Sequence, residues 1–294
     1  MRFVLAACVV VVLLFGLYKA PKDTEAARVA IITPVPTTME SAPAHDVHAQ
    51  QPPASEQTPP APPALPTKPT ESALSLPAVA VIIDDINAPE QLHTIDTIPL
   101  AITPAIMPNN TINPKSSELH KNREAYLVHL PLQAHNFVQR EHIVLEDTES
   151  AESIAKRIAD IVAQFPNVHF LNNHTGSKFT EHEDSMRALL LALHEHNILF
   201  VDSKTTSKSV ARHVAESLGL RIVERDVFLD FDKKPAKIAK QLHLAITIAK
   251  KRGYAIAIGH PYPETFAVLS QPQWRDLGVA FVYLDTLVKE KIWR

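Results

Sequence analysis

Two adjacent carboxylates, Asp84 and Asp85, follow six apolar residues in the stretch AVAVIIDD at 78–85. At the end of a buried strand such charges repel each other, and the pKa of one is raised unless a cation compensates. A divalent metal supplies that compensation, and one Asp with two His is a ligand set that leaves a coordination position open for water. Two imidazoles that could complete the set are His129, in the apolar run AYLVHLPL, and His174, in FLNNHTGS.

The sequence therefore predicts a metal site with Asp85, His129 and His174 as ligands. Asp84 would act as general base on the metal-bound water, and His260, in AIAIGHP, would protonate the leaving group. Two alternatives stay open at this point. His129 in an apolar run also suits a hydrogen-bonded core histidine, and the Asp pair also suits a cap or a turn.

The elements that must position these residues are apolar runs of strand length, mostly unbroken, which is typical of strands buried on both faces. Segments with helical spacing separate them, with Thr148 or Ser150 as a cap of the first and Gly253 closing the last. This alternation predicts an α/β fold with a mainly parallel sheet, and seven or eight units within 78–294 favour a distorted (β/α) barrel. The expected strands are 78–83, 100–106, 125–132, 168–172, 198–201, 221–229, 254–258 and 279–284, and the expected helices are 148–165, 181–197 and 234–253.

Polar residues end almost every expected strand. In parallel β/α folds the residues that do chemistry lie at the C-terminal ends of strands, so we expect these side chains to support the site. Aromatic residues are sparse, and the ones expected near the mouth of the site are Phe179, Phe228 and Tyr262. The polar residues that we expect to support the site are Asn173, Ser177, Asp202, Ser203, Lys204, Arg225 and Asp226.

Composition excludes several classes of function. With a formal net charge of -3, the chain lacks the excess of basic residues that is typical of a nucleic-acid-binding protein. No glycine occurs from 78 to 175, which removes the Gly-rich loops of nucleotide-binding folds. The one cysteine, Cys8, lies in the N-terminal apolar segment, so a metal in the domain must use His, Asp or Glu.

The N-terminal part of the chain predicts export. Residues 3–18 are continuously apolar after Met1 and Arg2, which indicates a signal anchor or a signal peptide. Residues 19–77 contain hardly any large apolar residues, and eleven prolines fall between Pro34 and Pro69, which predicts a disordered linker. We expect a periplasmic or cell-envelope protein, tethered to the inner membrane by 3–18, with a folded domain at 78–294 and no other membrane contact.

Five motifs in the domain, taken together, resemble the divergent, exported bacterial branch of the polysaccharide deacetylase (NodB-like) superfamily. They are VIIDD, VHLPL, LNNHTGSKFT, FVDSKT and AIAIGHP, in that order. The resemblance covers nearly all of 78–285. It implies a distorted (β/α) barrel that removes acetyl groups from glycans with a divalent metal, usually zinc.

Carried over by position, the resemblance implies that Asp84 is the base, Asp85 and His174 are metal ligands and His260 is the acid. Two positions depart from the family's pattern. Ile86 and Asn87 follow the Asp pair where the family has glycine, and Lys178 stands where a second motif histidine would ligate.

Three hypotheses follow from these observations. The first is a metal-dependent deacetylase acting on a cell-envelope carbohydrate. The second is a non-catalytic envelope protein that uses the same cleft to bind glycan or a protein partner. The third is a hydrolase that uses the same metal set on a different ester or amide.

Overall fold

The computed structural model describes residues 75–136 and 144–292. The predicted anchor at 3–18 and nearly all of the predicted linker at 19–77 lie outside the described residues. Within the described ranges, no helix is long and apolar enough to cross a membrane.

Strands and helices alternate along the domain. The strands are β1 (Ala78–Ile86), β2 (Ile102–Ile106), β3 (Leu127–Leu132), β4 (Phe170–Thr175), β5 (Leu199–Asp202), β6 (Val223–Glu224), β7 (Val227–Phe228), β8 (Tyr254–Gly259) and β9 (Ala280–Phe281). The α-helices are α1 (Pro89–Thr97), α2 (Ala151–Gln164), α3 (Glu183–Glu195), α4 (Ala211–Ser217), α5 (Pro235–Arg252), α6 (Pro263–Leu269) and α7 (Leu284–Leu287). Shorter helical turns are η1 (Ser116–His120), η2 (Phe179–Glu181), η3 (Pro272–Trp274) and η4 (Val288–Ile292).

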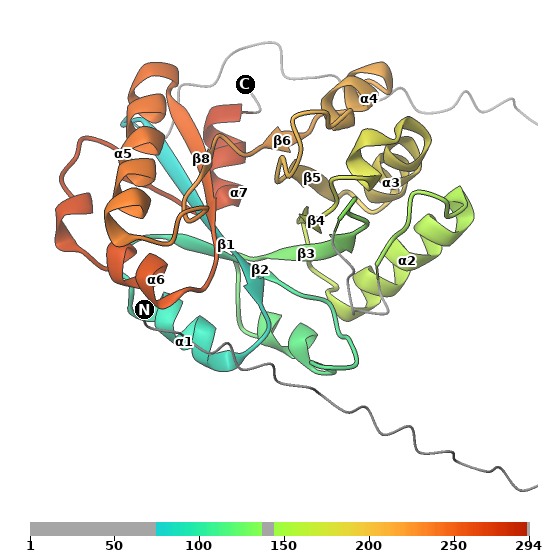
Figure 1. Ribbon diagram of the computed structural model, residues 1–294, viewed down its shortest axis with the longest axis horizontal. Coiled ribbons are helices and arrows are strands. Elements are labelled where there is room, and N and C mark those ends of the chain that lie inside the picture. The colour runs from blue at the N-terminus through green and yellow to red at the C-terminus, as the bar shows by residue number, and fades with distance from the viewer. Residues whose placement is uncertain (1–74, 137–143, 293–294) are drawn as a thin grey trace, which may run out of the picture. The chain divides into compact units, whose positions relative to one another are not determined.

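The sheet is parallel and curls until its two edges approach each other. Its strand order is β6-β5-β4-β3-β2-β1-β8-β7, and β9 pairs with the beginning of β1. The edge strands β6 and β7 stand at opposite ends of this order, yet only Arg225 and Asp226 separate them in the chain. Two residues span roughly 10 Å at most, so the edges must lie close together. The predicted distorted barrel is therefore confirmed, with helices such as α2, α3, α5 and α6 around the outside of the sheet (Figure 1).

The same link corrects one predicted element. The apolar run 221–229 was expected to form one strand, but it divides into β6, which pairs with β5, and β7, which pairs with β8. Hydrogen bonds reflect this change of partner, because Arg225 N donates to Asp202 O and Asp226 N donates to Ile256 O. Apolar composition alone does not reveal that the chain passes from one sheet edge to the other at this point.

Both faces of the sheet are buried, as the unbroken apolar runs predicted. Along β1, Val79, Val81 and Ile83 face the helices and belong to the larger cluster of buried apolar residues. Ala78, Ala80 and Ile82 face the barrel interior, where they pack in a second cluster with residues of α7. This alternation follows from the two-residue period of a strand. The interior-facing members of α7 and η4 are Leu284, Leu287 and Val288.

Two of the expected helix ends have the predicted chemistry. Ser150, rather than Thr148, is the N-cap of α2, and its side chain accepts a hydrogen bond from Ser153 N at 3.1 Å. Helix α5 ends at Gly253, which has a φ of 96° in the left-handed region. Glycine adopts this conformation at no steric cost, so the helix can stop and the chain can enter β8 directly.

We predict that the interior contribution of α7 is a large part of the stability of the barrel. Leu284 is fully buried there, so Leu284→Ala should lower the free energy of unfolding by about 2–5 kcal/mol because it leaves a cavity. Leu244→Ala removes a leucine that is 47% exposed on α5 and should change that free energy by only about 0.5 kcal/mol. Urea denaturation of the purified protein measures both changes. Equal small effects of the two substitutions would contradict this role for α7.

Candidate active site

An irregularity at the end of β1 turns both carboxylates of the Asp pair toward the barrel interior. Register with β2 pairs Ile83 with Pro104 and Ile86 with Ile106, so β1 contains one extra residue between these pairs. Asp85 lies in this bulge with a φ of 58°. Neighbouring residues of a regular strand point to opposite faces, whereas a bulge re-aims one of them.

The imidazole of His129 meets both carboxylates. Its Nε2 lies 3.2 Å from Asp85 Oδ1 and 3.7 Å from Asp84 Oδ2. His129 comes from the middle of β3 and is 2% exposed, so it reaches the acids inside the barrel rather than at the surface. The structure thus places this histidine at the predicted centre and not elsewhere in the core.

His174 completes the group from the neighbouring strand β4. Pro131 of β3 pairs with His174, as His129 pairs with Asn172, so both of these β4 side chains are on the same face as His129. His174 Nδ1 lies 2.9 Å from Asp85 Oδ1 and 3.2 Å from His129 Nε2. All three predicted ligand residues therefore direct one donor atom each to a common point.

This donor set fits a divalent metal. Ligand atoms about 2.0–2.1 Å from a tetrahedral ion stand roughly 3.3 Å apart, close to the separations of 2.9, 3.2 and 3.2 Å among these three atoms. Asp85 Oδ1 is also a buried oxygen that lies 2.9 and 3.2 Å from the two ring nitrogens, neither of which is aligned to donate a hydrogen bond to it. A buried carboxylate oxygen without a hydrogen bond is costly unless a cation compensates, and one Asp with two His is a set that zinc accepts.

Asn172 connects Asp84 to His129. Its Oδ1 lies 2.7 Å from His129 Nδ1, which therefore donates and leaves Nε2 directed to the centre. Its Nδ2 donates to Asp84 Oδ1 at 2.8 Å and to Ser203 Oγ at 3.1 Å. A ligating histidine typically donates its second ring nitrogen in this way, which fixes the orientation of the ring.

His260 stands on the other side of the acids, at the end of β8. Its Nε2 lies 4.0 Å from Asp85 Oδ2, and its Nδ1 lies 2.9 Å from Asp230 Oδ1. The other oxygen of Asp230 accepts from His260 N at 2.6 Å and from Thr265 Oγ1 at 2.7 Å. Gly259 permits this approach, because a Cβ there would stand 3.1 Å from Asp230 Oδ2.

The two carboxylates have different pKa values because their surroundings differ. Burial raises the pKa of Asp84, and the charges of His129 and His260 offset only part of this effect. Burial alone would also raise the pKa of Asp85, but its contacts with His129 and His174 outweigh burial and hold that pKa below its usual range. A raised pKa suits a base that must take a proton, and a lowered pKa suits a ligand that must stay ionised.

The imidazoles of His129 and His260 have raised pKa values. Burial lowers the pKa of His129, but the charges of Asp84 and Asp85 outweigh burial and raise it to about 9. For His260, burial is outweighed by the hydrogen bond with Asp230 and by the charges of Asp84 and Asp85, so its pKa is also raised. His260 can therefore carry the proton that a general acid donates.

The residues expected to support the site divide into two groups. Ser203 accepts from Asn172, Asn173 Oδ1 accepts from Ser203 N at 2.8 Å, and Arg225 Nε donates to Ser203 O at 2.6 Å, so these three lie around the centre. The others make contacts elsewhere: Ser177 with His135, Asp202 with Ser209, Lys204 with Glu224 and Asp226 with Arg252. Lys178 likewise pairs with Asp147 and not with the centre.

Sequence reasoning gave no role to Asn172, Asp230 or Thr265. The signal for Asn172 is its position two residues before His174, which puts both side chains on one face of β4. The signal for Asp230 is its place after the apolar run that ends in VFL. No local pattern indicates Thr265. Phe179 was expected near the mouth but is fully buried in the outer core, so that expectation is wrong.

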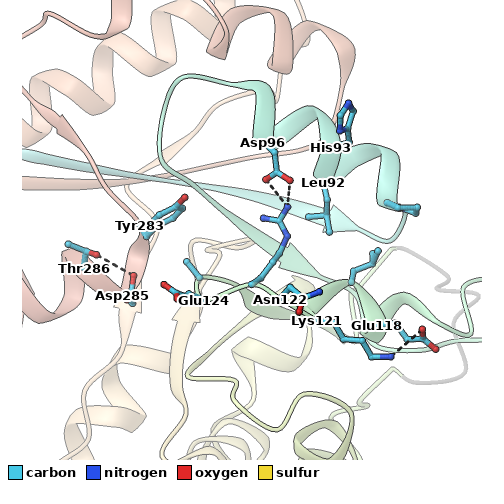
Figure 2. A pocket seen from close by; sticks show the side chains of 14 residues that line it. Leu92, His93, Asp96, Glu118, Lys121, Asn122, Glu124, Tyr283, Asp285 and Thr286 are labelled. Atoms are coloured by element: carbon cyan, nitrogen blue, oxygen red, sulfur yellow. Dashed lines mark hydrogen bonds and ion pairs between the residues drawn. The ribbon is translucent and has the colours of Figure 1, made fainter.

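A hollow lies apart from this centre. It has a volume of about 810 Å³ and is lined by α1, by the segment before β3 and by Tyr283–Thr286. Figure 2 shows Asp96 at this hollow, and the two carboxylate oxygens of Asp96 each lie 2.7 Å from Arg123 Nη2. None of the convergent acids and imidazoles described above lines this hollow. We therefore assign the chemistry to the strand ends and not to this hollow.

A parallel (β/α) barrel with carboxylates and imidazoles at its strand ends is the class that fold and site define, and comparisons with known proteins place the chain within it. Residues 81–288 match the model of the divergent polysaccharide deacetylase family. The chain is 33% identical over 205 residues to the protein YibQ of Escherichia coli (strain K12). This match covers 68% of this chain and 64% of that relative. It is 34% identical over 193 residues to a protein of Haemophilus influenzae (strain ATCC 51907 / DSM 11121 / KW20 / Rd), covering 65% of this chain and 69% of that one. Both relatives are described as uncharacterized.

A crystal structure of an uncharacterized protein from Agrobacterium tumefaciens C58 has the same fold. Its TM-score is 0.66 at 17% identity, and the match covers 74% of this chain and 92% of that one. The chain belongs to the divergent polysaccharide deacetylase family, as the five motifs predicted. Since it spans 64% of the length of the E. coli relative, the activity and substrate of the whole protein are treated below as proposals.

We predict that Asn172 is essential to the stability of the site. Asn172→Leu has a similar volume but leaves Asp84 Oδ1, His129 Nδ1 and Ser203 Oγ without this partner in a buried place. The free energy of unfolding should fall by about 3 kcal/mol, because buried polar groups that lose their partners remain desolvated. Asn167→Leu, at an exposed position, is the control and should change that free energy by at most about 0.5 kcal/mol. A similar small change for both variants in urea denaturation would contradict the prediction.

We also predict that metal affinity rises with pH. The raised pKa of about 9 means that His129 carries a proton at neutral pH, and a metal at Nε2 must displace it. Zinc affinity should therefore increase by up to about tenfold per pH unit between pH 6 and pH 8, with proton release on binding. Competition with a chelator and calorimetry in buffers of different ionisation enthalpy measure the two effects. His135→Gln, on an exposed imidazole, should leave both unchanged, and an affinity independent of pH would refute the displacement.

Proposed function

We propose that this protein is a metal-dependent hydrolase that removes acetyl groups from a cell-envelope carbohydrate, exported and tethered to the inner membrane by residues 3–18. One observation carries the proposal. Three ligand atoms from β1, β3 and β4 converge between a carboxylate whose pKa is raised and an imidazole whose pKa is raised. Membership of the divergent polysaccharide deacetylase family supports the carbohydrate substrate.

A divalent metal, which we propose to be zinc, held by Asp85, His129 and His174 would polarise the acetyl carbonyl and lower the pKa of a water molecule. Asp84, with Oδ1 fixed by Asn172, takes the proton of the attacking water at its free oxygen. His260 donates a proton to the leaving nitrogen or oxygen, and Asp230 holds its ring and stabilises its positive charge. Base and acid thus flank the reacting carbon from two different strands.

We predict distinct losses in two variants of the centre. Asp84→Asn should keep stoichiometric zinc but release acetate from an N-acetylated oligosaccharide about 10²–10⁴-fold more slowly, because the base is missing. Asp85→Ala should lose both zinc and activity. Asp96→Asn, which makes the same change at an exposed carboxylate in the other hollow, is the matched control and should retain both.

Zinc content by elemental analysis and acetate release by the full chain provide the measurements. A wild-type chain that holds no stoichiometric metal, together with full function of Asp85→Ala, would refute the proposal. Acetate release from small esters or amides, but from no acetylated saccharide, would identify the hydrolase of a different substrate.

A second candidate function is a non-catalytic envelope protein that binds glycan. The observation that favours it is Lys178, which stands at the family's second histidine position and pairs with Asp147 at 3.1 Å, away from the centre. Glycan binding that is insensitive to a chelator and to Asp84→Asn, without acetate release, would support this alternative.

A further inference from the structure

A row of aromatic rings leads outward from the candidate acid. The rings of Phe228 and His260 lie 5.4 Å apart between centroids, and the ring of Tyr262 stacks on His260 at 5.5 Å and 28°. Phe231 continues the row at 6.3 Å from Phe228, and 87% of Phe231 is exposed. We call these four side chains the aromatic ridge.

Cations cover two of the rings but leave Phe231 open. The guanidinium of Arg225 lies 5.0 Å from the centroid of Phe228, and the ammonium of Lys233 lies 3.5 Å from that of Tyr262. Arg225 also donates to the carbonyl oxygens of Ser203 and Lys204, so it is fixed. Among the described residues, Lys233 pairs with no carboxylate, and its charge remains available to a ligand.

The ridge is continuous with the candidate active site. His260 is both a member of the row and the residue whose Nε2 stands 4.0 Å from Asp85 Oδ2. A ligand that contacts Phe231 and Phe228 therefore reaches the reacting centre across one imidazole ring. Among the described residues, the large aromatic side chains that are exposed are Phe231 and Tyr283.

We propose that the aromatic ridge is a binding subsite for a sugar ring of the glycan substrate, adjacent to the sugar that is deacetylated, and that Lys233 selects glycans carrying a carboxylate. The face of a pyranose ring presents C–H groups that pack on an aromatic face through dispersion and burial of apolar area. A carboxylate on the same or the next sugar pairs with the ammonium of Lys233, which lies over the ring of Tyr262 and has no carboxylate partner among the described residues. The inference rests on the proposed function in taking the ligand to be a glycan, but it concerns binding and not catalysis.

The surroundings of Phe231 favour a sugar over a lipid surface. Exposed Asp232 follows Phe231 directly, and its carboxylate would have to be desolvated if the aromatic ring entered the apolar part of a bilayer. A stacked sugar leaves this carboxylate in water. One phenylalanine also provides little apolar area for membrane binding, whereas it matches the face of one pyranose ring.

Binding of two tetrasaccharides to the full chain tests the subsite. The probes are a neutral tetramer of N-acetylglucosamine and an alternating tetramer of N-acetylglucosamine and glucuronate. Phe231→Ala should weaken binding of both probes by about tenfold through loss of the stacking contact. Phe231→Tyr keeps an aromatic ring and should bind both probes as the wild-type chain does. Leu244→Ala, which also removes an exposed apolar side chain, should have no effect.

A second pair of variants tests the charge. Lys233→Gln should weaken binding of the glucuronate probe by about fivefold and leave the neutral probe unchanged, whereas Lys234→Gln next to it should affect neither. Calorimetry gives the affinities, and saturation transfer from the aromatic protons to the sugar protons shows the stacking directly.

The outcomes separate this inference from the proposed function. Acetate release together with unaltered glycan binding by Phe231→Ala would overturn the subsite and leave the deacetylase. Binding that depends on Phe231 without any acetate release would support the subsite and remove the catalytic proposal. Absence of glycan binding, or association with vesicles of anionic phospholipid that Phe231→Ala abolishes, would overturn the subsite.

Discussion

The single extra residue near the end of β1 is the constraint on which the candidate site depends. In a regular strand Asp84 and Asp85 would point to opposite faces, one into the barrel and one into the helical layer. The bulge and the positive φ of Asp85 bring both carboxylates to the same side, within 3.7 Å and 3.2 Å of one imidazole nitrogen. Aspartate tolerates the left-handed region better than most residues, because its short polar side chain bonds locally. Backbone geometry thus accounts for the two adjacent acids, in addition to the cation that we propose between them.

The barrel interior is layered, and the layers follow from the two-residue period of its strands. Interior positions of β1 read Ala78, Ala80, Ile82 and then Asp84, so the wall is apolar until its last position. On β4 the same progression runs from Phe170 to Asn172. Residues of α7 fill the apolar layers, and the polar layer remains at the C-terminal ends. The apolar residues that stabilise the domain and the polar residues of the candidate site therefore lie in different layers of the same barrel interior.

Sequence reasoning found the centre because parallel strands end at a common edge, so polar strand ends must meet there. It could not predict hydrogen bonds between residues of two segments that are far apart in the chain. Asn172 contributes to the site because its side chain donates a hydrogen bond to Asp84. Asp230 contributes because its carboxylate is hydrogen-bonded to the ring of His260. The single strand expected at 221–229 failed for the same reason, since its division reflects the meeting of two sheet edges. The pattern of apolar and polar residues predicts which face of a strand each side chain occupies. It does not predict which side chains from different strands contact each other across the barrel.

Lys178 stands where the family's motif has a second histidine, and in this chain the second imidazole near Asp85 comes from another strand. The family's second histidine would come from the loop after β4, but Lys178 pairs with Asp147 instead. His129 supplies an imidazole from the adjacent strand β3, and the register of β3 with β4 places it beside Asn172. Because Asn172 Oδ1 accepts a hydrogen bond from His129 Nδ1, Nε2 faces the same point as Asp85 and His174. One carboxylate and two imidazoles therefore converge without a histidine at position 178, so Lys178 does not by itself exclude a metal site.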